Sequence, residues 1–339
     1  MELLGLSLAL IALFVSFGFM VGVFFGFFGM GGSFLVTPAL LILGYPAPVA
    51  IGSSMAFVFG TAVIATLKHH DVGQVDYKLG GLMFVGIVLG IEAGKYGVFF
   101  LDQLGQAELV VGVAYVLLLA AIGVIFTRSA LKGEDAEEAA GGGEDDIPEI
   151  AQKIKSYNIP PMVTLTDGSK ASLWTISGVG GGVGVVSGFL GVGGGFLRMP
   201  AIYYLIGVPL AAAVGTSLFG ALMSGAVGAF TYGLDGVVDL GVVTALLAGS
   251  ALGARIGSGA TAYVNEDDVT IYFGIMLLLA STAVGVGELA EWLAMPILDT
   301  VSFVLLVGSS VFVTTVILYY GAKAVRSERS APAAAAGDD

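Results

Sequence analysis

Long uncharged stretches separated by short polar segments dominate the chain. Mostly apolar runs cover residues 4–28, 49–67, 79–91, 109–126, 237–254, 271–287 and 297–322. Many of them approach the roughly 20 residues that an α-helix needs to cross about 30 Å of hydrocarbon. A membrane β-barrel would instead alternate apolar and polar residues in segments of about 10 residues, and the sequence lacks that pattern. We therefore predict an all-α, polytopic helical membrane protein.

The composition supports this prediction. Of the 339 residues, 57% are hydrophobic and 12% are charged, against about 25% charged in soluble domains. The absence of cysteine excludes disulfides and thiolate metal or redox sites. The formal net charge of −13 argues against nucleic acid as a partner, since nucleic-acid binding requires a basic surface. The acidic excess has two interpretations, an acidic linker or halophilic adaptation to high salt.

A polar segment divides the chain. It is rich in acidic residues and glycine, including GEDAEEAAGGGEDD at 133–146, and such a composition buries little apolar surface. The predicted organisation is a first transmembrane repeat (1–127), an acidic soluble linker (128–170), a second transmembrane repeat (171–287), an extra C-terminal transmembrane helix (288–322) and a polar tail (323–339).

Both membrane halves contain the same glycine-rich sequence. Residues 22–38 read GVFFGFFGMGGSFLVTP, and residues 184–200 read GVVSGFLGVGGGFLRMP. After one inserted residue the correspondence continues, with GYPAPVAIGSS (44–54) matching GVPLAAAVGTS (207–217) and DVGQVD (71–76) matching LDGVVD (234–239). We infer an internal duplication, so the predicted fold has two homologous halves, each with a glycine-rich broken or re-entrant helix.

The repeated pattern G-x-x-G-x-G-G-[GS]-F-L-x-x-P, followed by Ala-x-Gly-[Ser/Thr]-Ser and a loop ending in Val-Asp, resembles the TauE/SafE family of sulfite exporters. The resemblance covers nearly all of residues 10–287, in both halves. It implies a transporter in the cell membrane, an exporter of sulfur-containing anions such as sulfite or organosulfonates, rather than an enzyme. The resemblance leaves the substrate, the direction and the coupling ion open.

The glycine clusters have three interpretations. A dinucleotide fingerprint would need a strand before it and an acidic residue about 20 positions later, whereas the flanks are apolar and residue 52 is glycine. Close helix packing through small residues is the second interpretation. The third is a helix broken within the bilayer, where unwound backbone lines a cavity and matching breaks in two halves mark a binding site. The following pieces, 33–44 and 196–206, are too short to cross alone.

We predict that the anion binds to backbone N–H groups at the breaks, to hydroxyl groups after Gly52 and Gly215, and to one arginine. Arg198 has a planar guanidinium suited to an oxyanion; alternatively it reaches lipid headgroups or an acidic side chain. The hydroxyls could instead bond to a carbonyl of their own helix. The predicted substrate-binding residues are Gly29, Gly31, Gly32, Ser53, Ser54, Gly191, Gly193, Gly194, Gly195, Arg198, Thr216 and Ser217.

Four further residues are candidates for coupling or gating: His69, His70, Glu92 and Arg255. The histidines could equally lie in a solvated loop. Glu92 and Arg255 occupy matching positions in GIVLGIEAG and GSALGARIG, which predicts an ion pair between them, with Lys95 as the alternative partner of Glu92. Asp76 and Asp239 recur in matching loops and are predicted helix caps. We predict no catalytic residue, cofactor or metal site.

The basic residues give a topology. One topology follows if each short segment counts as a separate pass through the membrane. The basic residues Lys68 and Lys78, those of the linker and those after residue 322 then lie on one side of the membrane, and the halves are inverted repeats. Without that count, the halves are parallel repeats. The motif G-x-x-x-x-G-K-[ST] is absent from the sequence, so a gradient must drive transport. The alternatives are a passive anion channel and a membrane-embedded enzyme or assembly factor of a sulfur or redox pathway. The expected partners are a small sulfur anion and the lipid bilayer, and a homo-oligomer is left open.

Overall fold

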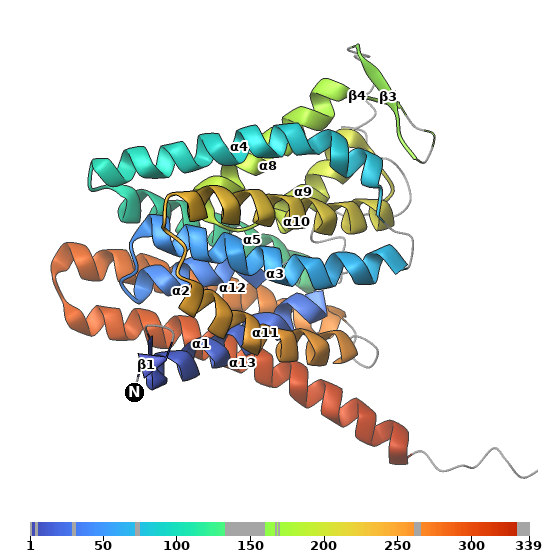
Figure 1. Ribbon diagram of the computed structural model, residues 1–339. Helices are drawn as coiled ribbons and strands as arrows, with labels where there is room; N and C mark the ends of the chain where they lie inside the picture. The colour runs from blue at the N-terminus through green and yellow to red at the C-terminus, as the bar shows by residue number, and fades with distance from the viewer. Residues whose placement is uncertain are drawn as a thin grey trace, which may run out of the picture.

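The computed structural model describes residues 2–3, 6–28, 32–71, 75–132, 160–166, 168, 170–260 and 266–330. Within these residues, nine helices are long and apolar enough to cross a membrane. Helices make up nearly all of the regular structure (Figure 1). The prediction of a polytopic helical membrane protein is therefore confirmed.

The first half has one short helix among four long ones. Its elements are the strands β1 (Glu2–Leu3) and β2 (Leu6–Ser7), then α1 (Leu8–Phe28), the 3-10 helix η1 (Gly32–Leu35), α2 (Val36–Ile42), α3 (Ala47–Asp71), α4 (Tyr77–Gln103) and α5 (Ala107–Lys132). The two strands pair with one another. Helix α5 thus extends past the predicted end of the first repeat at residue 127.

The second half follows the same order. After an antiparallel hairpin of β3 (Met162–Thr164) and β4 (Lys170–Ser172) come α8 (Leu173–Leu190), α9 (Gly195–Ala201), the π-helical η2 (Ile202–Ile206), α10 (Leu210–Leu234), α11 (Leu240–Ala260) and α12 (Glu266–Leu293). The additional helix α13 (Pro296–Ser330) begins eight residues later than the boundary predicted at 288. The hairpin begins within the segment predicted as linker, and β4 continues past the predicted boundary at residue 170.

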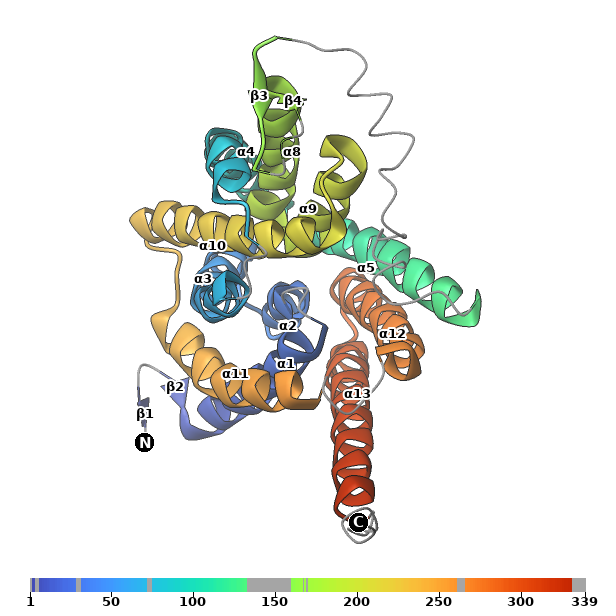
Figure 2. The same ribbon diagram turned by 90° about the vertical axis from the view of Figure 1, so that its right-hand side faces the viewer.

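The first helix of each half packs against a helix of the other half. Helix α1 packs against α11, and α8 packs against α4; Figure 2 shows these two pairs on opposite sides of α3 and α10. Glycines at every fourth position make the contact. A Cβ added at Gly18, Gly22, Gly86 or Gly90 would lie only 2.1–2.4 Å from a carbonyl oxygen of the facing helix. The small-residue strips of the sequence therefore bring backbones into direct contact.

Equivalent helices of the two halves run antiparallel. Helix α3 packs against α10, and α5 packs against α12. The facing pairs are Gly52 with Tyr232 and Phe59 with Gly225 in the first case, and Gly112 with Glu288 and Gly123 with Leu278 in the second. As residue numbers rise on one helix they fall on the other, which is the relation that inverted halves require. The duplication itself stays a prediction from the sequence.

One end of the helix bundle gathers the basic segments. The end of α3, the start of α4, the β3–β4 hairpin and the C-terminal end of α13 all lie on the right in Figure 1. Lys68, Lys78, Lys170 and Lys323 belong to these segments. By the positive-inside rule, this end is predicted to face the cytoplasm.

Candidate functional site

The second glycine segment (residues 191–195) separates two helices. Helix α8 ends at Leu190, and the N–H of Gly191 donates to the carbonyl of Ser187 at 2.7 Å. Gly191, Gly193 and Gly194 have φ angles of 75°, 66° and 73°, a region that side-chain-bearing residues rarely adopt. Helix α9 then begins at Gly195. The glycines are therefore required by the backbone at this turn.

The first glycine segment (residues 29–32) is only partly described. Gly29 and Gly31 lie outside the described residues, and Gly32 begins η1. The two segments approach each other through matching phenylalanines: the rings of Phe34 and Phe196 pack edge to face with centroids 6.1 Å apart. The residues that follow the two glycine segments therefore meet inside the protein.

Arg198 is completely buried in the short helix α9. Its Nη1 donates to the carbonyls of Gly193 (3.4 Å) and Ser217 (3.2 Å), and its Nη2 donates to Ser224 Oγ at 2.5 Å. All three acceptors are neutral. Among the described residues, Arg198 Nε has no hydrogen-bond partner.

The surrounding elements offer Arg198 no counter-ion. Helix α9 packs against α8, η2 and α10, and none of these three elements contains an acidic residue. The ion pairs found in the described part of the chain both involve Lys95. A buried charge without a counter-ion is destabilising by several kcal/mol, so Arg198 remains the predicted anion-binding residue.

A second polar group beside Arg198 is unpaired as well. Ser187, in the last turn of α8, is fully buried, and its hydroxyl has no partner among the described residues. A Cβ added at Gly194 would lie 2.5 Å from Ser187 Oγ and 3.3 Å from Arg198 Nη2, while one at Gly220 would lie 2.7 Å from Arg198 Nε. Two glycines thus make room for the guanidinium. Sequence reasoning missed Ser187. The signal that could have found it is the difference between the halves, because the aligned residue of the first half is the apolar Phe25.

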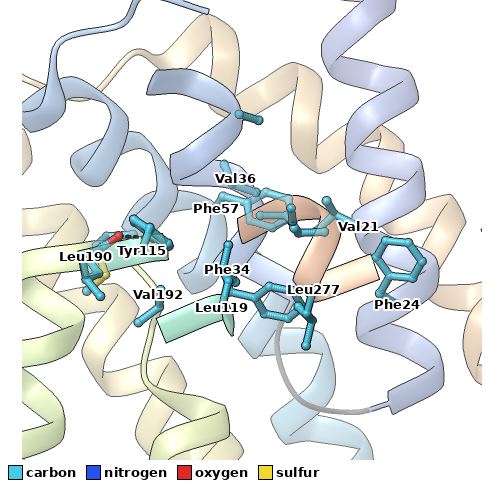
Figure 3. Packing of buried hydrophobic residues seen from close by; sticks show 14 of the residues in the cluster. Val21, Phe24, Phe34, Val36, Phe57, Tyr115, Leu119, Leu190, Val192 and Leu277 are labelled. Carbon is cyan, nitrogen blue, oxygen red and sulfur yellow. Dashed lines mark hydrogen bonds between the residues drawn. The ribbon is translucent and has the colours of Figure 1, made fainter. Parts of the chain in front are cut away.

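One of the predicted hydroxyls contacts the second glycine segment directly, and another is linked through Thr37 to the residue before the segment. Ser217 Oγ donates to the carbonyl of Gly195 at 2.7 Å. Ser54 Oγ lies 2.8 Å from Thr37 Oγ1, which donates to the carbonyl of Leu190 at 3.0 Å. Tyr115 donates to that same carbonyl (Figure 3). The first half therefore braces the second glycine segment through Thr37 and Tyr115, which the sequence did not single out.

The other two predicted hydroxyls accept hydrogen bonds from residues that cap helices. Ser53 Oγ accepts the N–H of Asp239, and Thr216 Oγ1 accepts the N–H of Asp76, both at 3.0 Å. The carboxylate of Asp76 caps α4, and that of Asp239 accepts the N–H of Val242 at the start of α11. The predicted caps are confirmed, and each is tied to a hydroxyl of the opposite half. A substrate contact by Ser53 or Thr216 stays a prediction.

The predicted pairing of Glu92 with Arg255 is wrong. Lys95 Nζ lies 3.8 Å from Glu92 and 2.7 Å from Asp235, while Arg255 is exposed on α11. Matching positions do not meet here because α4 packs against α8 and α11 packs against α1. The alternative partner, Lys95, is the one found. His69 and His70 belong to the last turn of α3, and their side chains lie outside the described residues.

Comparison with known proteins gives one family. The family model described as "Sulfite exporter TauE/SafE" matches residues 14–284. Among curated relatives, the probable membrane transporter protein YunE of Bacillus subtilis is 25% identical over 273 residues, which cover 78% of this chain and 93% of the relative. A probable membrane transporter protein of Xylella fastidiosa is 27% identical over 243 residues, covering 71% and 81%. No solved structure gives a significant match.

Proposed function

Because the chain belongs to the sulfite exporter TauE/SafE family, we propose that it is a secondary transporter that exports small sulfur-containing oxyanions, such as sulfite or organosulfonates. The site lies at the second glycine segment. The observation that carries the proposal is the burial of Arg198 with no acidic residue on the elements packed around it. Export is adopted from the description of the family.

The chemistry of the site suits an oxyanion. A guanidinium offers planar N–H donors whose geometry matches the oxygens of a carboxylate, phosphate or sulfonate. Arg198 Nε and Ser187 Oγ are both buried without partners among the described residues, and unpaired buried polar groups are costly. A bound oxyanion would neutralise the charge and accept hydrogen bonds from both groups.

Complete burial favours a transporter over a passive channel. Arg198 and Ser187 both have 0% of their surface exposed. A channel keeps a continuous aqueous path to the groups that select its ion, whereas a carrier exposes its site to one side at a time. In this state the site is closed to both sides. Family membership also favours transport over the alternative of a membrane enzyme or assembly factor.

The proposal is tested by counterflow in proteoliposomes. Vesicles loaded with unlabelled sulfite should transiently accumulate labelled sulfite when they contain the wild-type protein. Arg198→Gln should abolish this accumulation, while Arg128→Gln, which removes an exposed charge from α5, should leave it unchanged. Size-exclusion chromatography confirms that each variant is folded.

Two results would overturn the proposal. One is folded wild-type protein that moves neither sulfite nor a small sulfonate under a gradient of either sign. The other is wild-type flux in the Arg198→Gln variant, which would remove the arginine from the site. Flux that rises linearly with concentration, with no counterflow, would indicate a channel.

A further inference from the structure

The site at Arg198 holds a single formal charge. Helix α9, which carries Arg198, packs against the helices α8 and α10 and the π-helical η2. Arg198 is the only Asp, Glu, Lys or Arg residue in these four elements. Their remaining polar groups are neutral hydroxyls and backbone carbonyls, and the phenol of Tyr232 donates to the carbonyl of Gly188. The site therefore presents one positive charge to its ligand.

Two charged residues beyond these elements have partners of their own. Towards one end of the bundle, Asp76 accepts the N–H groups of Leu79 (2.9 Å) and Thr166 (3.3 Å). Towards the other end, Lys95 lies 2.7 Å from Asp235 and is neutralised there.

The charge balance limits the ligand. A monovalent anion beside Arg198 gives a neutral, fully buried pair, whereas a divalent anion leaves one uncompensated negative charge. Burying an uncompensated charge away from water costs several kcal/mol. Coulomb attraction to a single guanidinium cannot remove that penalty for the second charge. Neutral pairing is therefore the favourable state of the occluded carrier.

On this balance, we propose that the transported species is a monovalent oxyanion, such as hydrogensulfite or an alkylsulfonate, and not a divalent one such as sulfite dianion, sulfate or thiosulfate. This inference rests on the proposed function and specifies the charge of its substrate. The hydroxyl of Ser187 suits such ligands because a hydroxyl both donates and accepts. It donates to a sulfonate oxygen and accepts from the proton of hydrogensulfite.

The test compares two labelled anions below, at and above neutral pH. Sulfite interconverts with hydrogensulfite near neutrality, whereas methanesulfonate stays monovalent throughout. At constant total concentration, sulfite uptake into wild-type proteoliposomes should rise as the pH falls, in proportion to the hydrogensulfite fraction. Methanesulfonate uptake should stay constant, which controls for any effect of pH on the protein. Unlabelled sulfate in excess should not inhibit either flux.

A second set of vesicles removes passive permeation. Acidified sulfite also forms neutral sulfur dioxide, which crosses lipid unaided, so flux in Arg198→Gln vesicles is subtracted at each pH. Sulfite uptake that rises with pH, or inhibition by sulfate as strong as by methanesulfonate, would overturn the monovalent assignment and leave transport intact. The absence of saturable flux of either anion at every pH would instead refute the proposed function.

Discussion

The two glycine segments share their glycines and the Phe, Leu and Pro residues that follow, but they differ at the position of Arg198. Next to the second segment, Arg198 is surrounded by Ser187, Ser217 and Ser224. At the aligned position next to the first segment stands Val36, which is buried among hydrophobic residues (Figure 3). The aligned position is therefore charged in one half and apolar in the other.

The apolar side is packed with aromatic rings. Phe273 lies edge to face with Phe34 (centroids 5.9 Å apart), Phe24 (6.4 Å) and Phe126 (5.4 Å). Such pairs contribute about 0.5–1.5 kcal/mol each beyond the burial of their area. We infer that this side supplies rigidity, while the second segment binds the anion.

A paired exchange of residue sizes accompanies the difference. In the second half, a large Arg198 lies against Gly220. In the first half, the aligned residues are the smaller Val36 and the larger Phe57, both buried. On the predicted duplication and the proposed site, one copy binds the anion and the other copy supports it.

Giving the second half the residue sizes of the first half, at positions 198 and 220, should have the largest effect. We expect Gly220→Phe to displace the guanidinium, because even a Cβ would lie 2.6 Å from Arg198 Cδ. Flux should be lost, and stability should fall by at least about 1–3 kcal/mol from overpacking. The double variant Arg198→Val/Gly220→Phe copies the first half and should recover stability without flux. Thermal unfolding in detergent and uptake measure both; a double variant that transports would contradict the account.

Filling the second glycine segment should also abolish transport. Gly194 has a φ of 73°, and a Cβ there would lie 2.5 Å from both Ser187 Oγ and Val183 Cγ1, so we expect Gly194→Leu to give no measurable counterflow. Gly182→Leu is the matched control, because Gly182 lies on α8 with nothing within 4 Å of its added Cβ. Equal flux in the two variants would show that the segment does not shape the site.

Removing the unpaired hydroxyl should weaken binding without harming the fold. Ser187→Ala deletes a group that has no partner among the described residues, so the unfolding temperature should hardly change. We expect the KM for uptake to rise about tenfold, equivalent to about 1.4 kcal/mol, with little change in maximal flux. Ser224→Ala removes the acceptor of Arg198 Nη2 and should instead lower stability. An unchanged KM in Ser187→Ala would exclude this hydroxyl from the site.

The smallest predicted difference concerns the two caps. Asp76 caps α4 and also accepts the N–H of Thr166 from the segment between β3 and β4, whereas the Asp239 side chain accepts the N–H of Val242 at its helix start. We expect Asp239→Ala to cost about 1 kcal/mol, as for a typical cap, and Asp76→Ala somewhat more. Denaturant unfolding measures the loss of stability in each variant. A larger loss for Asp239→Ala than for Asp76→Ala would contradict the expected order of the two caps.

The sequence predicted the membrane spans and the caps at Asp76 and Asp239, because each leaves a local pattern. It singled out Arg198 as a candidate but left open whether the guanidinium is buried or reaches lipid headgroups. The sequence did not single out Ser187, Thr37 or Tyr115, because their contacts depend on which helices face one another. That arrangement follows from the exchange of α1 and α8 between the halves. The same exchange explains why the predicted pair of Glu92 and Arg255 does not form.

Ligand-dependent thermal unfolding tests the central claim most directly, namely that Arg198 is the counter-ion of the anion. Methanesulfonate at about a hundredfold excess over its Kd should stabilise the purified wild-type protein by about 2.7 kcal/mol. Arg128→Gln should show the same rise in Tm, Arg198→Lys a smaller one, and Arg198→Gln none. A full ligand-induced rise in folded Arg198→Gln would show that the anion binds elsewhere.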